Sequence, residues 1–327
     1  MTPAPGIAAP ESTEIRSAPA SGRRDSKSSP APVPVRVPAP KPGERIDWLR
    51  NIPYLSMHLA CFTVFFVGIS PIAVGVAALL FFLRMFAVTG FYHRYFSHKT
   101  FKTSRVFQFV MAIWGTSCVQ RGPLWWSAHH RHHHAYSDEV EDLHSPRWLG
   151  FWRAHAGWFL TPSGALTATQ YVRDWSRFRE LVLLDRFHGI VPLCLASAIF
   201  GLGVFLERFA PSLGTNGWQM LVWGFVISTV VLYHATYTIN SLSHTFGSKR
   251  FDTGDDSRNN LWLAFLTLGE GWHNNHHHYP NTARQGFYWW EIDITYYLLL
   301  GLSKLRLIHD LRPVPAHILE KNRLPGA

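Results

Sequence analysis

The central stretch of the sequence is Trp125-Trp126-Ser127-Ala128-His129-His130-Arg131-His132-His133-His134, in which five of the last six residues are histidines. A helix gains nothing from crowded imidazoles, because histidine is a mediocre helix former. In a helix, His130, His133 and His134 would stand at i, i+3 and i+4 and share one face. That spacing can bring three imidazole nitrogens to one metal ion. Taken alone, the stretch fits a histidine-rich surface tract equally well.

Two other stretches repeat this chemistry, and each adjoins or follows a long apolar run. They are His93-Arg94-Tyr95-Phe96-Ser97-His98 and His273-Asn274-Asn275-His276-His277-His278. In the second of them, His273, His276 and His277 repeat the i, i+3, i+4 spacing. A smaller element, Asn240-Ser241-Leu242-Ser243-His244, places Asn240 and His244 one helical turn apart. Four such elements favour a metal centre over a surface tract.

The composition indicates a membrane protein. Among the 327 residues, 47% are hydrophobic, 15% are aromatic and 16% are charged. Average soluble domains carry roughly 25% charged residues. The formal net charge is +10. Lys and Arg flank the apolar runs instead of forming a stripe that would bind nucleic acid, so we expect membrane lipid and no nucleic acid as a partner.

Apolar runs of nearly spanning length predict four transmembrane helices, at about residues 52–69, 72–89, 189–206 and 218–239. Residues 1–46 contain ten of the 21 prolines and no aromatic residue, which predicts a disordered Pro/Ala/Ser-rich tail. We expect a membrane domain over residues 47–315 and a C-terminal tail over residues 316–327. Arg84 lies in the second run, close enough to its end for the side chain to reach the interface.

The basic residues orient these predicted helices. Eight Lys and Arg residues precede the first run, whereas the turns on the opposite side hold only Arg208, which Glu207 balances. Because positively charged ends stay inside, four spans place both termini and all the histidine elements in the cytosol. The sequence therefore predicts an all-α integral membrane protein, with four transmembrane helices and a cytosolic helical cap that holds a histidine-rich site.

The expected metal ligands are nine histidines, with Asn240 as an additional oxygen contact: His93, His98, His130, His133, His134, His244, His273, His276 and His277. Nine histidines exceed what one metal ion can bind, so we expect two ions. Nitrogen ligands suit iron, zinc, copper or nickel, and the order of affinities does not choose among them. Two metals at a membrane face, beside an apolar interior, suggest oxidative chemistry on a lipid.

These motifs resemble those of the membrane fatty acyl desaturases, of the acyl-CoA (stearoyl-CoA, delta-9) type. The family's first box, H-x4-H, is matched by His93 and His98, and its second, H-x2-HH, by the histidines at 130, 133 and 134. The third box matches Gly269-Glu270-Gly271-Trp272-His273-Asn274-Asn275-His276-His277, and the family's N-S-x-x-H matches residues 240–244. The resemblance covers roughly residues 50–300.

The resemblance implies an oxidoreductase with a di-iron centre and a kinked acyl tunnel. Such an enzyme uses O2 to introduce a cis double bond, here expected at the delta-9 position, into a saturated acyl chain. The protein's part is to present one C–C bond to the metals and to exclude water. By the same comparison, Gln120, Trp126 and Thr236 line the tunnel at its kink. Met85 lies near its far end, with Phe81 one turn earlier on the same helix face.

The resemblance also sorts the residues around the metals. Glu270, and acidic residues within 138–142, are expected to orient ligating imidazoles through their second ring nitrogen. His129, His132 and His278 do not match ligand positions. They are expected at the surface or behind the ligands.

The acyl carrier departs from the animal enzymes. Those enzymes have a basic residue and an aspartate before the second box, where this chain has Ala128 and His129. They have a basic pair where this chain has Thr161-Pro162. These charges bind CoA in the family. We expect an acyl-CoA or acyl-lipid substrate, and the sequence does not choose among CoA, a phospholipid and a carrier protein as the acyl carrier. No His-Pro-Gly-Gly haem motif occurs, so we expect a separate electron donor of the ferredoxin, cytochrome b5 or flavoprotein reductase type.

Two other functions share some of these features. A membrane di-iron hydroxylase or monooxygenase would use similar histidine boxes but return one oxygen atom to its product. A non-enzymatic membrane metal-binding or transport protein would place its ligands at mid-membrane along a path. The histidine elements follow or precede the apolar runs, which argues against transport.

The expected location is a bacterial cytoplasmic membrane.

Overall fold

The computed structural model describes residues 44–326, so nearly all of the predicted tail over residues 1–46 lies outside the described residues. This part of the chain is mainly helical. Its β-structure includes a two-stranded antiparallel sheet of β1 (Lys102–Thr103) and β2 (Ile308–His309).

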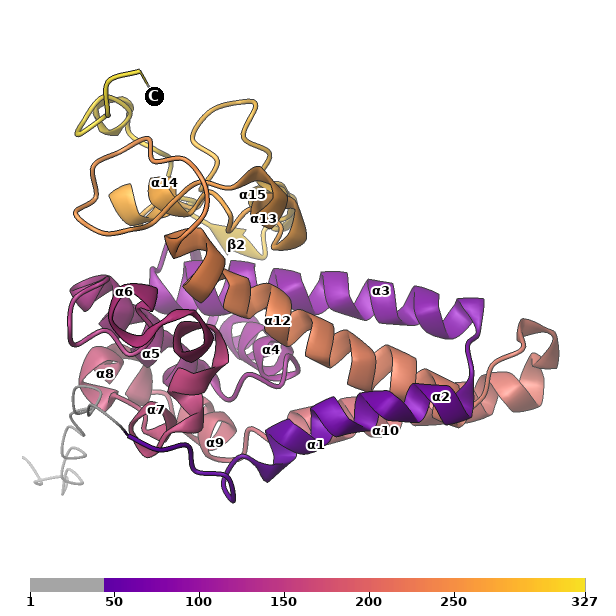
Figure 1. Ribbon diagram of the computed structural model, residues 1–327. Coiled ribbons are helices and arrows are strands. Elements are labelled where there is room, and N and C mark those ends of the chain that lie inside the picture. Colours follow the sequence, from indigo (N-terminus) through magenta and orange to yellow (C-terminus); the bar gives the residue numbers. More distant parts are fainter. Residues whose placement is uncertain (1–43, 327) are drawn as a thin grey trace, which may run out of the picture. The chain divides into compact units, whose positions relative to one another are not determined.

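Long apolar helices contact one another along their length and project from a group of shorter helices, the cap (Figure 1). The long helices are α1 (Ile52–Ala60), joined through a 3-10 turn (Cys61–Thr63) to α2 (Val64–Val67); α3 (Pro71–Phe86), continued by a π-helix (Ala87–Ser97); α10 (Ile190–Phe209); and α11 (Gly217–Gln219), continued by a π-helix (Met220–Ile227) into α12 (Ser228–Ser241). The cap contains α4 (Arg105–Thr116), α5 (Pro123–Tyr136), α6 (Pro146–Leu149), α7 (Pro162–Ala165), α8 (Arg173–Ser176), α9 (Arg179–Arg186), α13 (Leu261–Leu266), α14 (His273–His278) and α15 (Ile294–Lys304).

Three helices in the described residues are long and apolar enough to cross a bilayer: Pro71–Ser97, Ile190–Phe209 and Gly217–His244. They coincide with the spans predicted near residues 72–89, 189–206 and 218–239. The helix predicted at residues 52–69 is present as Ile52–Val67. It rises only about 24 Å at 1.5 Å per residue, which is less than the roughly 30 Å of a hydrocarbon core. The chain is therefore a membrane protein with three full-length apolar helices and one shorter one.

The turn between α2 and α3 is encoded by a few residues. Gly68 adopts a φ of 70°, in the region that favours glycine, and ends the first helix. Ser70 caps α3, because its Oγ accepts a hydrogen bond from the backbone N–H of Ala73 at 3.1 Å. Pro71 then occupies the first helical turn, where its missing N–H costs nothing.

The helix that begins at Pro71 is longer than its apolar run. The sequence predicts a span ending near residue 89, but the helix continues to Ser97 and carries His93 within it. The polar side chains after Thr89 do not interrupt backbone hydrogen bonding. The change in hydropathy therefore marks the edge of the apolar zone and not the end of the helix.

Arg84 does not extend to the interface as the sequence suggests. Its side chain is 1% exposed, and it donates hydrogen bonds to Thr229 Oγ1 at 2.7 Å and Ser228 Oγ at 2.5 Å. A buried guanidinium requires such partners, since it has lost its water. The two hydroxyl groups of α12 replace that water, so Arg84 connects α3 to α12.

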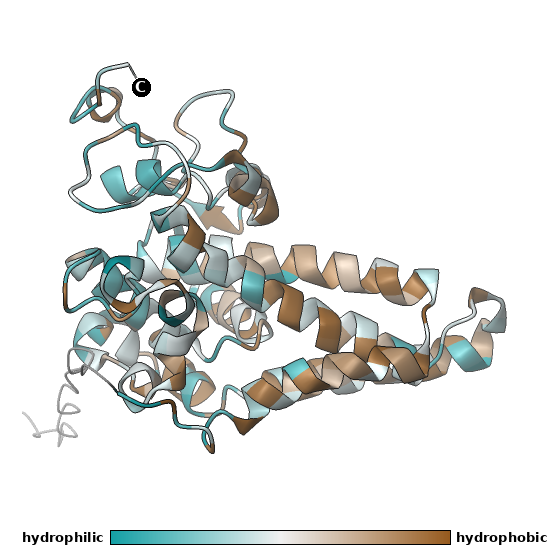
Figure 2. Cartoon of the chain, in the orientation of Figure 1, coloured by the Kyte–Doolittle hydropathy of each residue, from teal (hydrophilic) through white to brown (hydrophobic). Residues whose placement is uncertain are grey.

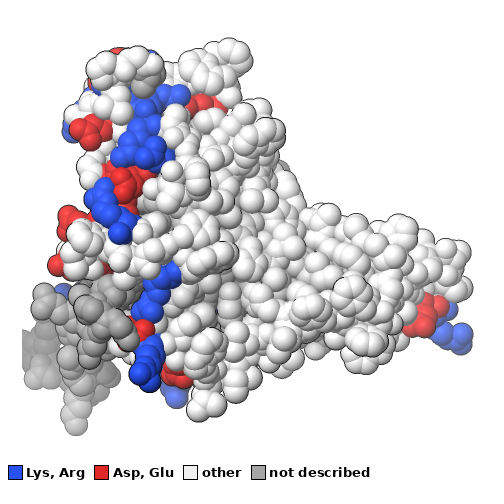
Figure 3. All heavy atoms as spheres, viewed as in Figure 1, with Lys and Arg blue, Asp and Glu red and all other residues white. Residues whose placement is uncertain are grey.

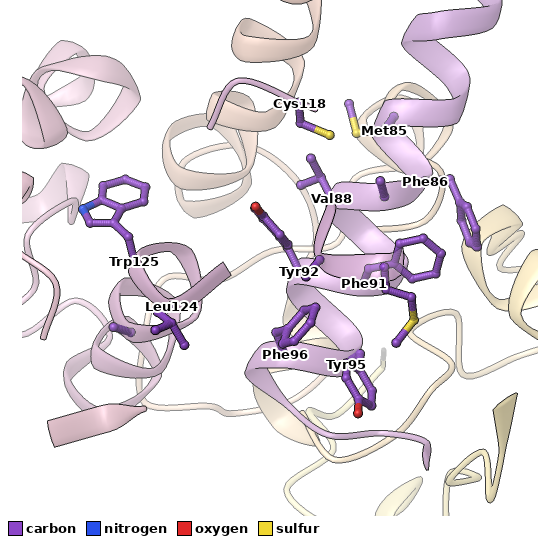
Figure 4. Close-up of a cluster of buried hydrophobic side chains, with 14 of the residues drawn as sticks. Met85, Phe86, Val88, Phe91, Tyr92, Tyr95, Phe96, Cys118, Leu124 and Trp125 are labelled. Atoms are coloured by element: carbon purple, nitrogen blue, oxygen red, sulfur yellow. The ribbon is translucent and has the colours of Figure 1, made fainter. Parts of the chain in front are cut away.

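Buried aromatic side chains pack the end of the long α3 helix into the cap. Phe91, Tyr92 and Phe96 are each 0% exposed. Figure 4 shows these side chains on one helix, with Phe91 and Tyr92 on opposite sides and Phe96 further along it. Gly115 of α4 permits this packing, because a Cβ there would lie 2.1 Å from Cε1 of Tyr92. Truncating a buried phenylalanine to alanine costs about 3–5 kcal/mol, so this contact fixes the helix that carries His93.

Hydropathy separates the long helices from the cap. In Figure 2 the long helices are mostly hydrophobic, whereas hydrophilic residues are common in the cap. Figure 3 shows the charged residues gathered over the cap end, and the visible face of the long helices is almost free of them except at the far tip. Phe65 and Phe66 on α2 are 79% and 88% exposed, as expected for side chains that contact lipid.

The C-terminal segment, which the sequence suggests as a tail over residues 316–327, packs on the cap. Ile318 is buried beside Phe251 and Phe287, and Arg323 forms an isolated β-bridge with Phe251. The fold therefore continues past residue 315.

Candidate metal centre

Five of the predicted ligands meet in one place, which we call the first histidine group: His93, His98, His130, His134 and His276. One ring nitrogen from each lies within 4.8 Å of the others. The Nε2 atoms are closest in three pairs: His98–His130 at 2.7 Å, His134–His276 at 2.8 Å and His93–His276 at 3.0 Å. The extension of α3, the central α5 and the cap helix α14 thus bring distant parts of the sequence to one point.

The other four predicted histidines form the second histidine group: His133, His244, His273 and His277. Their nitrogens also lie within 4.8 Å of one another, and Nε2 of His244 is 3.0 Å from Nε2 of His273. Nε2 of His277 is buried and has no hydrogen-bond partner among the described residues. Asn240 borders a small cavity together with His133 and His273, so the predicted oxygen contact lies beside this group.

The second and third histidine boxes are each divided between the two groups, whereas His93 and His98 of the first box both belong to the first group. In α5, His130 and His134 belong to the first group and His133 to the second. The same holds in α14, where His276 is separated from its neighbours at 273 and 277. The three histidines of one such box therefore do not share a metal position in this structure, although their spacing alone would allow it. Successive helical residues are rotated by about 100°, so His133 and His134 point in different directions and each helix contributes to both groups.

Carboxylates hold three imidazoles of the second group from behind. The Nδ1···Oδ2 pairs are His133–Asp142 at 2.9 Å, His244–Asp138 at 2.8 Å and His277–Asp255 at 2.6 Å. A metal-bound histidine usually donates its second N–H in this way, which fixes the ring and leaves Nε2 as the free lone pair. Asp138 and Asp142 belong to the acidic run that the sequence suggested. Asp255 does not, because it lies in a loop far from any recognisable box.

Behind the first group, the support is different. Glu270, predicted for this role, contacts Nδ1 of His93 and also accepts a hydrogen bond from Arg94 at 3.0 Å. Arg94 pairs with Asp293 as well, at 2.9 Å. The side-chain amide of Gln285 lies 3.3 Å from Nδ1 of His93 and 3.4 Å from Nδ1 of His276. No sequence motif pointed to Gln285, which follows the third box in an irregular segment.

The site favours neutral imidazoles and ionised carboxylates. Burial, reinforced by neighbouring histidines, holds the pKa well below its ordinary value in His98, His130, His134, His273 and His276. Burial alone would raise the pKa of Asp138, Asp142 and Asp255, but the histidines that they contact outweigh burial and lower it. Neutral imidazole is the form that binds metal.

This donor set fits two metal ions. Two nitrogens that each lie about 2.1 Å from one metal, at right angles to each other, are about 3 Å apart. The Nε2 separations within the pairs match this value. Where Nδ1 donates to a carboxylate, Nε2 presents a lone pair. Where two Nε2 lone pairs face each other, a metal ion between them removes their repulsion, and the buried, unpartnered Nε2 of His277 is available to the same ion.

The histidines that were not expected as ligands lie outside both groups. Nε2 of His129 donates to the carbonyl oxygen of Leu166, and Nε2 of His278 donates to that of Ile318, both at 2.9 Å. His132 packs against Tyr136, with ring centroids 5.0 Å apart. His144, which belongs to no box, lies 3.3 Å from Asp142. It shares Asp142 with His133, so it stands behind the second group.

A cavity of about 620 Å³ borders the metal centre, and His130 and Asn240 form part of its wall. The three residues predicted at the tunnel kink all line it. Trp126 Nε1 donates to Gln120 Oε1 at 3.3 Å, and the Gln120 amide donates to Thr236 Oγ1 at 2.9 Å. This chain of hydrogen bonds joins α5 to α12 beside the histidines.

A second cavity of about 50 Å³ shares Trp126, His130, Thr236 and Asn240 with the first. Met85, which is 1% exposed, lines this smaller space as the sequence suggests. Phe81 lines neither of the two cavities and packs against the hydrophobic core. The shared residues therefore lie between a large compartment and a nearly filled one.

Comparison with known proteins agrees with this chemistry. A sequence model of the fatty acid desaturase family matches residues 69–304. The chain belongs to the fatty acid desaturase family. It is 33% identical to the sn-1 stearoyl-lipid 9-desaturase of Anabaena variabilis over 272 residues, which cover 82% of this chain and 94% of that protein.

Two further relatives are similar over comparable lengths. The sn-1 stearoyl-lipid 9-desaturase of a Synechocystis species is 34% identical, over 84% of this chain and 83% of its own. The hex-5-enoyl-[acyl-carrier protein] acetylenase of Moorena producens is 33% identical, over 84% and 87%. The resemblance drawn from the histidine boxes is thus confirmed. The desaturase is an oxidoreductase of lipid metabolism, held in a membrane, with histidine clusters that can bind metal.

Proposed function

We propose that this desaturase introduces a cis double bond at the delta-9 position of a saturated acyl chain, with one iron ion in each histidine group. The observation that carries the proposal is the position of Trp126, His130, Thr236 and Asn240, which line both cavities. An acyl chain that passes from the large cavity into the small one must run beside both groups. The delta-9 position is supported by the relatives from Anabaena and Synechocystis, which are both stearoyl-lipid 9-desaturases.

The protein contributes ligands and position. The proposed ligands are the nine grouped histidines, with Asn240 beside the second group. Bound iron would supply the oxidising chemistry that uses O2 and two external electrons, because no side chain can remove hydrogen from an unactivated methylene group. The Trp126–Gln120–Thr236 hydrogen bonds hold the bend of the cavity, and a fixed bend presents one C–C bond to the metals.

The membrane arrangement belongs to the same proposal. Ile52–Val67 would form a fourth, shorter span, since it contacts the helix of residues 220–227 along the bundle. Four spans would place both termini and the metal centre in the cytosol, and the charged residues at the cap end in Figure 3 support this orientation. A separate electron donor would then reach the cap from the cytosol, and the bacterial cytoplasmic membrane is the proposed location.

Fatty acid profiling tests this function directly. The chain is expressed in cells that make no unsaturated fatty acids of their own, with a His133→Ala chain as the inactive control. We expect new cis-9 monounsaturated acids in the first cells and none in the second. Growth under isotopically labelled O2 separates the alternative, because a hydroxylase would place the label in its product and a desaturase would release it as water. A labelled hydroxy acid as the main product would contradict the proposal.

A further inference from the structure

The charges on the wall of the large cavity are unbalanced. Its lining includes two arginines, Arg50 and Arg121, but no aspartate or glutamate. Most of the remaining wall is apolar or aromatic, with Trp125, Trp158 and Phe159 among its residues. A positive charge in apolar surroundings is costly unless it is paired. This cavity therefore contains cations whose counter-charge is not among the described residues that line it.

A strained loop places one of these cations. Val119 and Arg121 adopt φ angles of 61° and 63°, which are unusual for residues with side chains, above all for β-branched valine. Tyr233 donates from its hydroxyl to the carbonyl of Val119 at 2.9 Å, and Tyr92 donates to the carbonyl of Arg121 at 3.0 Å. The surroundings thus hold a conformation that the loop alone would avoid, as is common at functional sites. It keeps Gln120 at the bend and Arg121 at the cavity wall.

Arg121 has few partners within the protein. Its Nη1 donates to the carbonyl of Ala165 at 2.8 Å, and its guanidinium lies over the ring of Trp125, 4.7 Å from the centroid. It forms no ion pair in the part of the chain that the structure describes. Burial and the nearby Arg50 lower the pKa of Arg121 to about 10, so the side chain remains charged at neutral pH.

Asp185, an acid that interacts electrostatically with Arg121, already accepts other hydrogen bonds. Asp185 of α9 lies at the start of α5, where its Oδ1 accepts hydrogen bonds from the backbone N–H groups of Leu124 at 3.0 Å and Trp125 at 2.9 Å. This position is that of a helix cap, and it uses the carboxylate for the helix. Asp185 does not line the cavity. Its negative charge stabilises the charged form of Arg121, but the two side chains form no ion pair.

We propose that Arg121 binds an oxyanion at the carboxyl end of the acyl substrate, with Arg50 as a second, more exposed positive charge. A planar guanidinium matches phosphate and carboxylate geometry and prefers such partners when it is partly desolvated. The site would therefore favour acyl chains whose carrier is charged, such as acyl-CoA or a phospholipid, over chains esterified to an uncharged galactolipid. This inference rests on the proposed function only in taking an acyl chain as the occupant of the cavity.

Equilibrium binding, which needs no turnover, tests the inference. Full-length protein in detergent is titrated with radiolabelled palmitoyl-CoA, palmitate, palmitoyl phosphatidylglycerol and palmitoyl galactolipid. Arg121→Gln should weaken binding of the ligands with an oxyanion about ten- to hundred-fold and change galactolipid binding less than about two-fold. Arg121→Lys should recover part of the loss. Arg179→Gln, the same change at an exposed residue of α9, is the matched control and should alter none of them.

The four ligands also identify the source of the charge. A loss confined to palmitoyl-CoA and phosphatidylglycerol identifies phosphate, and a loss that includes palmitate identifies any oxyanion near the chain. Both results support the inference. An equal loss for galactolipid would show that Arg121 only maintains the loop, and no loss for any ligand would remove it from the site. Either result overturns the proposal.

Two further readouts keep the test independent. If Arg121→Gln does not fold, the salt dependence of ligand binding is measured in the wild-type protein and in Arg121→Lys. Added salt should weaken palmitoyl-CoA binding and leave galactolipid binding unchanged, and equal salt dependence would count against the inference. Metal content and fatty acid profiles are measured separately. A protein that binds oxyanion ligands through Arg121 but makes no unsaturated product would refute the proposed function and leave this inference standing.

Discussion

The two histidine groups have the same donor atoms but different support. The first has five imidazoles, and the groups behind them are one carboxylate, Glu270, which is shared with Arg94, and the uncharged Gln285. The second has four imidazoles, and three aspartates stand behind them. The second group therefore has more carboxylates directly behind its imidazoles than the first.

This difference indicates two inequivalent metal positions. A carboxylate behind a histidine fixes the ring and makes it a stronger donor. The second group compensates for its smaller number of imidazoles with this support and with Asn240 nearby. The first group depends more on the number of its ligands. The following experiments either sharpen this contrast or remove it.

The largest expected effect comes from removing a ligand. His98→Ala in the first group and His277→Ala in the second should each abolish desaturation, because the remaining nitrogens cannot hold the metal pair. The same result is expected for the other grouped histidines. His132→Ala and His278→Ala, outside both groups, are the controls and should keep substantial activity. Product formation is measured by fatty acid profiling, and full activity in a His133→Ala protein would refute the assignment.

A smaller effect should come from the supporting residues, and here the groups should differ. Asp255→Asn should lower metal affinity in the second group about 10- to 100-fold, because it removes the charge behind His277. Gln285→Leu should lower affinity in the first group by less, since the amide is uncharged and its contacts are long. Metal affinity is measured by competition with a chelator. Asp310→Asn, at an exposed ion pair with Lys102, should change nothing. Equal losses in the two groups would erase the contrast.

Acidification should destabilise the metal-free protein. Five grouped histidines have a folded-state pKa well below the ordinary value of about 6.5, so the unfolded chain binds more protons between pH 7.5 and 5.5. The lowered pKa values of the supporting aspartates act only at lower pH. His133, whose pKa is raised because Asp142 and other acids outweigh its burial, opposes this trend.

The expected result is a loss of stability of up to about 1.4 kcal/mol per pH unit for each such histidine below pH 6.5. The thermal unfolding midpoint of metal-free protein in detergent should therefore fall as the pH decreases from 7.5 to 5.5. Bound metal should reduce this dependence, because it occupies the neutral nitrogens. A midpoint that is constant over this range would show that the imidazoles are not held neutral by burial.

The smallest effect concerns the small cavity between the groups. Met85 fills part of its wall, so the wild type should prefer a palmitoyl-length chain over a stearoyl-length one. Met85→Ala should shift the product ratio toward the longer chain, with the bond position from the carboxyl end unchanged. Met111→Ala, which removes an equally buried methionine away from both cavities, controls for lost stability. An unchanged ratio in an active Met85→Ala protein would exclude Met85 from the tunnel.

The sequence predicted the positions of the long helices, because an apolar run of about 18 residues is a strong signal. It also predicted which nine histidines come together, because the motifs repeat a helical spacing. It did not predict how α5 and α14 divide their histidines, because that depends on how the helices are placed relative to each other. The length of the helix from Pro71 to Ser97 was underestimated, because backbone hydrogen bonding continues where hydropathy changes.

Other residues gave no signal in the sequence. Asp255 and Gln285 lie in irregular segments, and only tertiary contacts bring them to the imidazoles. The sequence placed Arg84 near the membrane edge. In the structure its guanidinium donates hydrogen bonds to Ser228 and Thr229, which are distant in the sequence. Arg121 is adjacent to a predicted tunnel residue. That no acidic residue lines the cavity beside Arg121 can be seen only in the folded structure. The spacing of residues within one segment does not predict partners that lie far away in the sequence.

The most direct test of the central claim is a structure of the purified, iron-loaded protein with anomalous scattering measured at the iron absorption edge. Two histidine groups with distinct support predict two iron peaks per chain, one among the Nε2 atoms of each group. The peak in the second group should weaken selectively in Asp255→Asn. A single peak shared by both groups, or a signal at the zinc edge alone in protein made with ample iron, would contradict the account.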